Sequence, residues 1–153
     1  MPVSLADAWM FFSNPHNLSK LTPSFLNLKV INNVFGNEIY PGQVMLYKVK
    51  PFLGLSVTWM TEITHVQKEK MFVDEQRKGP YALWHHQHHF KAIEGGVKMT
   101  DVIHYRLPFG LIGNLFHGRL VKKKLEQIFL YRYEKVKELF GDWKNDSPNI
   151  NID

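Results

Sequence analysis

Between Phe25 and Tyr105, apolar and polar residues alternate with a period of two. This period is typical of β-strands that turn one face to a core and the other to water. Breaks containing proline, glycine or lysine divide the region into six runs, at residues 26–34, 43–50, 55–66, 71–78, 82–91 and 97–107. Because the breaks are short, the runs predict an antiparallel meander in which each strand pairs with its neighbour along the chain.

Helical patterns flank this meander on both sides. Two short helices are predicted in tandem, over residues 4–13, where Ser4 is the N-cap, and over 16–21. A long amphipathic segment at 114–140 is predicted to be the helix that covers the apolar face of the sheet. Its apolar stripe consists of Val121, Leu125, Ile128, Phe129, Val136, Leu139 and Phe140. The expected fold class is therefore α+β, with a curved sheet of about six strands around a long C-terminal helix.

The 153 residues are enough for one domain with its own core. We expect this domain to span residues 1–141 and a polar tail to follow at 142–153. Of the net charge of +5, residues 119–138 carry +4, with seven basic and three acidic residues. A solvated face of the long helix accounts for this excess, and no recognition motif accompanies it, so we expect no nucleic-acid partner.

The sequence contains no cysteine, which excludes disulfides, thiolate metal sites and cysteine nucleophiles. It has no apolar run long enough to span a membrane and no signal-peptide pattern. We therefore expect a cytoplasmic protein without a transmembrane segment. No glycine-rich phosphate loop is present either, and no cofactor is expected.

Lysine residues indicate which face of a strand is exposed, because lysine is rarely buried. In the run 82–91, the face opposite Lys91 holds Trp84, His86, His88 and Phe90. In the run 97–107, the face opposite Lys98 holds Val97, Met99, Asp101, Ile103, Tyr105 and Leu107. These two sets are predicted to point inward.

The faces of two further strands are assigned from the same alternation. The run 55–66 is expected to direct Trp59, Thr61 and Ile63 inward. The run 71–78 is ambiguous, because its two faces are similarly polar: Phe72, Asp74 and Gln76 alternate with Val73, Glu75 and Arg77.

Arg132 falls within the apolar stripe of the long helix. A buried guanidinium requires a carboxylate partner, because an unpaired buried charge costs several kcal/mol. Asp101 is the preferred partner, with Asp74 or Glu75 next. The interior is thus expected to be mostly aromatic and aliphatic with a few convergent polar groups, which is the composition of a ligand pocket. The candidate ligand-binding residues are Tyr47, Trp59, Thr61, Asp74, Gln76, Trp84, His86, His88, Met99, Asp101, Tyr105, Leu125, Phe129 and Arg132.

Several segments resemble the START-like (SRPBCC, helix-grip) superfamily, and more narrowly its polyketide cyclase/dehydrase-like branch, some members of which are labelled cell division inhibitor. They are FVDEQ at 72–76, GPY at 79–81, WHHQHHF at 84–90, MTD at 99–101, YRLPFG at 105–110 and IFLYR at 128–132. The resemblance implies a helix-grip fold and an internal cavity for a hydrophobic ligand. It also implies a β-strand ahead of the PVSL segment at 2–5, with which this chain begins, so the usual first strand is expected to be missing. An open sheet edge would then invite a homodimer, covering by the C-terminal tail, or an upstream start.

Three classes of function remain open from the sequence. The favoured one is the binding of a small hydrophobic molecule that is lipid-like, polyketide-like or aromatic. The second is a cyclase- or dehydratase-like enzyme, with His86, His88, Asp101 and Arg132 as candidate catalytic residues. The third is a regulatory domain that binds another protein. A metal site on His86 and His88, with Asp101 as third ligand, is the less favoured interpretation, because the local pattern contains no third ligand.

Overall fold

The computed structural model describes residues 1–32, 36–50, 55–108, 110–143, 148 and 150, and for 110–117 the backbone alone. Its helices, in chain order, are α1 (Leu5–Phe12), the 3-10 helices η1 (Pro15–Leu21) and η2 (Ser24–Leu26), and α2 (Gly110–Phe140). Its strands are β1 (Lys29–Val30), β2 (Val44–Val49), β3 (Val57–Gln67), β4 (Met71–Lys78), β5 (Leu83–Ile93) and β6 (Gly96–Arg106).

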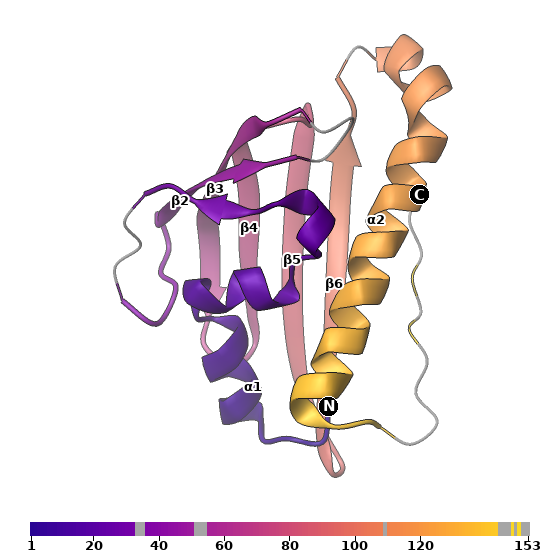
Figure 1. Ribbon diagram of the computed structural model, residues 1–153. Helices are drawn as coiled ribbons and strands as arrows, with labels where there is room; N and C mark the ends of the chain where they lie inside the picture. The colour runs from indigo at the N-terminus through magenta and orange to yellow at the C-terminus, as the bar shows by residue number, and fades with distance from the viewer. Residues whose placement is uncertain (33–35, 51–54, 109, 144–147, 149, 151–153) are drawn as a thin grey trace.

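The strands form one antiparallel sheet of six, and their order in space is their order in the chain. β5 and β6 pair without interruption, from Leu83 opposite Arg106 to Ile93 opposite Gly96. The pairing of β3 with β4 shifts register twice, and such bulges bend and twist a sheet. Figure 1 shows the curved sheet with α1 and α2 on the same side of it, α2 running along β6. The α+β meander with a long C-terminal helix is confirmed.

The start of α1 depends on the predicted N-cap. Ser4 Oγ accepts a hydrogen bond of 3.1 Å from the backbone N–H of Asp7, which satisfies one of the orphan donors in the first helical turn. The Ser4 backbone carbonyl accepts the first helical hydrogen bond, from Ala8 N.

We expect Ser4→Ala to lower the free energy of unfolding by about 1 kcal/mol, because the Asp7 N–H loses its protein acceptor. Urea denaturation followed by circular dichroism measures this change. Ser19→Ala, at an exposed position of η1, is the matched control and should stay within about 0.5 kcal/mol of the wild type. Equal effects of the two substitutions would contradict a stabilising cap.

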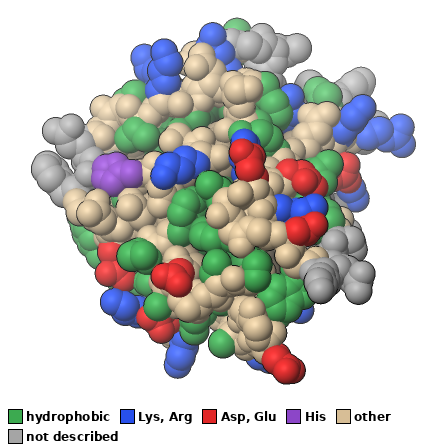
Figure 2. All heavy atoms as spheres, turned by 60° about the horizontal axis from the view of Figure 1, so that its bottom comes forward, with side chains coloured by type: hydrophobic (Ala, Val, Ile, Leu, Met, Phe, Trp, Pro, Cys, Tyr) green, Lys and Arg blue, Asp and Glu red, His purple; other side chains and the backbone are tan. Residues whose placement is uncertain are grey.

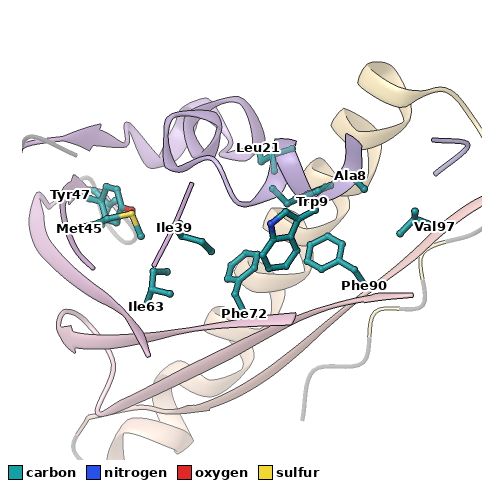
Figure 3. Close-up of a cluster of buried hydrophobic side chains, with 12 residues drawn as sticks. Ala8, Trp9, Leu21, Ile39, Met45, Tyr47, Ile63, Phe72, Phe90 and Val97 are labelled. Carbon is teal, nitrogen blue, oxygen red and sulfur yellow. The ribbon is translucent and has the colours of Figure 1, made fainter. Parts of the chain in front are cut away.

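The core beneath α1 is built around Trp9, whose side chain is 2% exposed. Its ring meets Phe72 and Phe90 edge-on, at centroid distances of 6.1 and 5.6 Å. Figure 3 shows the indole between these two phenyl rings. Phe12, one turn further along α1, packs on Phe90 and on Phe140 of α2. Aromatic contacts therefore fix α1 to both the sheet and the C-terminal helix.

A second group of buried side chains joins α2 to the ends of β5 and β6. It consists of Tyr81, Trp84, Leu107, Val121 and Leu125. Val121 and Leu125 are 3% and 2% exposed, which confirms that this part of the predicted apolar stripe faces the sheet.

Three details differ from the prediction. The run 26–34 contributes only Lys29–Val30 to the sheet, because η2 ends at Leu26 and Asn27 adopts a left-handed conformation with φ of 45°. Residues 33 and 34 of that run lie outside the described part of the chain. α2 begins at Gly110 rather than at residue 114. Leu139 is 46% exposed, because Val136 and Phe140 occupy the positions that face the core at this end of α2.

Met1 pairs with the outer edge of β6 through backbone hydrogen bonds. Met1 N donates to Val97 O over 3.0 Å, and Val97 N donates to Met1 O over 2.9 Å. A side chain at position 96 would collide with the Met1 carbonyl and the Trp143 ring, so Gly96 leaves the room that both segments use. No strand precedes α1 among the described residues, and residues from both ends of the chain lie at this edge.

The basic residues at the start of the predicted 119–138 cluster lie on the solvated side of α2, where Arg119, Lys122 and Lys123 are exposed. On the face shown in Figure 2, Lys and Arg side chains are interspersed with Asp, Glu and apolar ones. In the described part of the chain, no helix is both long enough and apolar enough to cross a membrane.

Candidate functional site

Three neighbouring strands bring two aspartates and two histidines together on the inner face of the sheet. Asp74 of β4 stands opposite His86 of β5, and His88 of β5 stands opposite Asp101 of β6. His86 and His88 are 5% and 4% exposed. The pairing with β5 resolves the ambiguity of the run 71–78, because it places Asp74 inward. These four residues are called the His–Asp cluster below.

Each carboxylate of the His–Asp cluster contacts both imidazoles. Asp74 Oδ2 lies 3.3 Å from His86 Nδ1 and 2.8 Å from His88 Nε2. Asp101 Oδ1 lies 3.0 Å from His86 Nε2 and 2.8 Å from His88 Nδ1. The centroids of the two rings are 3.8 Å apart. The cluster is therefore a closed ring of four nitrogen–oxygen contacts.

The two imidazoles respond differently to this environment. Burial alone lowers the pKa of His86, but the charge of Asp74 and the hydrogen bonds to both aspartates outweigh it and raise the pKa to about 9. Burial and the positive charge of His86 lower the pKa of His88. One added proton therefore resides on His86, and the pair carries a single positive charge.

Both aspartates stay ionised despite their burial. Burial raises the pKa of Asp74, but the positive charge of His86 and the contacts with both imidazoles outweigh this effect and lower the pKa. For Asp101, the charge of Arg132 and hydrogen bonds from the histidines likewise overcome burial and hold the pKa well below its usual range. Two carboxylates thus face one imidazolium and one guanidinium, so the charges balance.

Arg132 reaches the His–Asp cluster from α2. Its Nη1 lies 3.9 Å from Asp101 Oδ1, and its Nη2 lies 3.5 Å from His88 Nδ1. The guanidinium carbon is 5.7 Å from the centroid of the Phe12 ring. The structure confirms that Asp101 is the carboxylate partner of this partly buried arginine.

A cleft with a volume of about 660 Å³ lies between β6 and α2. Asp101 and Arg132 form a polar part of its wall. Its apolar lining comes from β6, from α2 and from the segment after α2, and includes Met99, Ile103, Phe129, Val136, Trp143 and Ile150. The volume is in the range of small-molecule sites, and the lining has the mixed character of such sites.

The candidate ligand-binding residues divide between this cleft and the rest of the interior. Those that line the cleft are Met99, Asp101, Tyr105, Leu125, Phe129 and Arg132. Asp74, His86 and His88 are not among the described cleft-lining residues, and they adjoin the cleft through Asp101.

The remaining candidates serve the core. Tyr47 and Thr61 are buried within β2 and β3, and burial and the charge of Asp74 raise the pKa of Tyr47. The Trp59 and Trp84 rings pack edge-on at 5.4 Å. Gln76 donates through Nε2 to the backbone carbonyl of Tyr81 over 2.7 Å. None of these five residues is among the described cleft-lining residues.

Sequence reasoning missed part of the cleft wall. Trp143, Pro148 and Ile150 line it, although they belong to the segment 142–153, which was expected to be a polar tail. The signal was present, because these are isolated apolar residues in an otherwise polar segment.

A scan against models of protein families matches none of them, and a search of curated proteins gives no match. The fold, in contrast, is similar to solved structures over most of the chain. Protein Ms6760 from Mycobacterium smegmatis has a TM-score of 0.62 at 17% identity, covering 91% of this chain and 85% of that one. TTHA0849 from Thermus thermophilus has a TM-score of 0.62 at 16% identity, covering 90% of both chains. Ara h 8.0201 has a TM-score of 0.56 at 16% identity, covering 90% of this chain and 92% of that one.

The architecture and these similarities define the class of the protein. It has the helix-grip α+β fold, in which a curved antiparallel sheet packs against a long C-terminal helix. At these identities the similarity is one of fold, and fold alone does not assign a function.

Proposed function

We propose that the protein binds one small, largely apolar molecule in the cleft between β6 and α2. The observation that carries the proposal is the cleft of about 660 Å³, which is lined by apolar side chains from both elements and has Asp101 and Arg132 in its wall. Apolar walls supply affinity, and a few fixed polar groups orient the ligand. The resemblance to the polyketide cyclase-like branch supports a lipid-like, polyketide-like or aromatic molecule.

Arg132 supplies the polar contact in this proposal. Its side chain lines the cleft and carries a positive charge. A carbonyl, carboxylate or sulfonate oxygen on the ligand would pair with the guanidinium there, and hydrogen bonds to charged groups are the stronger ones. The cleft therefore favours apolar molecules with an acidic or carbonyl group at one end.

Binding is favoured over acid–base catalysis by an imidazole. A general base must reach the proton that it removes, and neither histidine is among the described residues of the cleft wall. Asp101 does line the cleft, but its lowered pKa makes it a weak base.

The proposal predicts that 1-anilinonaphthalene-8-sulfonate, an aromatic probe with one anionic group, binds with a stoichiometry of one. Ile103→Trp fills the cleft from β6 and should weaken this binding about tenfold or more, because the larger ring takes the space of the probe. Leu130→Trp, on the solvated face of α2 at a residue that is 47% exposed, should leave the affinity unchanged. Fluorescence titration measures both affinities, and near-ultraviolet circular dichroism verifies that each variant is folded.

Equal affinities of Ile103→Trp and the wild type would contradict the proposed site. Native mass spectrometry of the protein as purified gives a second readout. A retained apolar molecule that is absent from Ile103→Trp but present in Leu130→Trp supports the cleft as the binding site.

A further inference from the structure

The nitrogen–oxygen contacts of the His–Asp cluster outnumber the N–H groups that two neutral imidazoles can supply. Each of its four contacts joins a ring nitrogen to a carboxylate oxygen, at 2.8–3.3 Å. A neutral imidazole has one N–H and one lone pair. Four hydrogen bonds would therefore require both rings to be imidazolium ions, with centroids only 3.8 Å apart. Two positive charges at that distance, in a buried site, repel one another strongly.

With the one added proton on His86, three N–H groups serve the four contacts, so one contact is left without a hydrogen bond. If a bound cation takes the place of that proton, a different assignment is available. Asp101 Oδ1 lies next to one nitrogen of each ring, His86 Nε2 and His88 Nδ1. If both of these nitrogens carry the hydrogen and donate it to Asp101, then the lone pairs of His86 Nδ1 and His88 Nε2 remain. Both of these nitrogens lie next to the same atom, Asp74 Oδ2. Three electron-pair donors then converge with no proton among them.

Such a convergence is the geometry of a cation site. Asp74 Oδ2 is 3.3 Å from one donor nitrogen and 2.8 Å from the other, and one ligand atom from each of the three residues lies within 4.8 Å of the others. Metal–nitrogen and metal–oxygen bonds of about 2.0–2.2 Å separate neighbouring ligand atoms by about 2.8–3.6 Å in octahedral or tetrahedral sites. Both nitrogen–oxygen spacings, 3.3 and 2.8 Å, lie in this range.

We propose that Asp74, His86 and His88 bind one divalent transition-metal ion, through Asp74 Oδ2, His86 Nδ1 and His88 Nε2. Imidazole and carboxylate ligands suit zinc, iron(II) and related ions. Three protein ligands leave further coordination positions for water or another small ligand. The third ligand is Asp74, whereas the sequence pattern had suggested Asp101.

Asp101 acts as the outer carboxylate of the proposed site. A metal-bound histidine usually donates its other N–H to such a group, which fixes the orientation of the ring. Here one oxygen of Asp101 serves both histidines. Packing supports the same orientation, since Phe72 stacks on the His88 ring at 4.0 Å and Phe129 meets the His86 ring edge-on.

The test is titration of the untagged, chelator-treated full chain with Co²⁺, whose visible absorption reports a protein-bound ion. We expect uptake of one equivalent by the wild type, and displacement by Zn²⁺. Asp74→Asn and His88→Gln should each weaken binding about 100-fold or more, and Asp101→Asn about 10- to 100-fold, because it removes only the orienting carboxylate.

β4 and β5, which carry the three proposed ligands, also provide a matched control pair on the outer face of the sheet. His85 Nδ1 lies 2.8 Å from Glu75 Oε1, so Glu75→Gln and His85→Gln alter an equivalent histidine–carboxylate contact that is not part of the site. Both should keep the affinity of the wild type. Ile103→Trp should keep it too, which separates failure of the metal site from failure of the apolar cleft.

A folded wild type that takes up no Co²⁺ at micromolar concentrations overturns the proposal, as does Co²⁺ binding that depends on His85 rather than His88. If the ligand variants do not fold, nitrogen NMR of the wild-type histidine rings with Zn²⁺ decides. One metal-bound and one protonated nitrogen in each of His86 and His88 supports the site. Two protonated nitrogens in either ring contradict it.

Discussion

Replacing Asp101 by alanine should lower the free energy of unfolding by about 3–5 kcal/mol, which is the cost of removing one partner of a buried ion pair and leaving the other charge uncompensated. Asp101 is the partner of Arg132 and of both histidines. Its removal leaves the guanidinium and the imidazoles with Asp74 as the remaining carboxylate of the cluster. The balance of two negative against two positive charges is then lost in a place where water is largely excluded.

The experiment is urea denaturation of Asp101→Ala beside Glu75→Ala, in buffer with a chelator so that metal binding does not contribute to stability. Glu75 also contacts a histidine and an arginine, His85 and Arg77. Arg77 is 44% exposed, however, so Glu75→Ala should cost about 1 kcal/mol or less. If the two substitutions have similar costs, the inner cluster is not the buried charge network described above.

Replacing Trp9 by alanine should also cost about 3–5 kcal/mol, because a large buried ring is lost and a cavity remains. The indole is 2% exposed and contacts Phe72 and Phe90. Its Nε1 donates to Glu38 Oε1 over 2.9 Å, a hydrogen bond that disappears with it. Because Trp9 links α1 to β4 and β5, the loss should weaken the docking of the whole helix.

Met10 provides the control for this substitution, since it is the next residue in α1 and is 67% exposed. Met10→Ala should change the free energy of unfolding by about 0.5 kcal/mol or less. Thermal and urea denaturation of both variants test the comparison. A cost for Trp9→Ala near that of Met10→Ala would mean that α1 contributes little to the stability of the core.

The period-two pattern was sufficient to predict β4, β5 and β6, because long strands with one buried face and short connections leave few alternatives. It failed for residues 26–34, where a few apolar residues fit a strand and a 3-10 turn equally well. Asn27, which ends η2, adopts a left-handed backbone conformation. The hydrophobic pattern gives no information about such a conformation.

The same reasoning located part of the candidate site. Lys91 and Lys98 indicated the faces of their strands and so placed His86, His88 and Asp101 inside. Asp74 could not be assigned from its own strand, because its face carries as many polar residues as the opposite one. Its position opposite His86 is a property of the pairing between strands, and the tail residue Trp143 enters the cleft through tertiary packing that periodicity cannot predict.

The agreement between strand order and chain order bears on the route by which the protein folds. Hairpins such as the one at Glu94 and Gly95 close short loops, so the sheet grows at a low entropic cost for each strand. The pairing of Met1 with Val97, in contrast, closes a loop of 96 residues. We therefore expect the hairpins of β3 to β6 to form before the transition state and α1 to dock after it, so that Trp9→Ala accelerates unfolding more than it slows refolding.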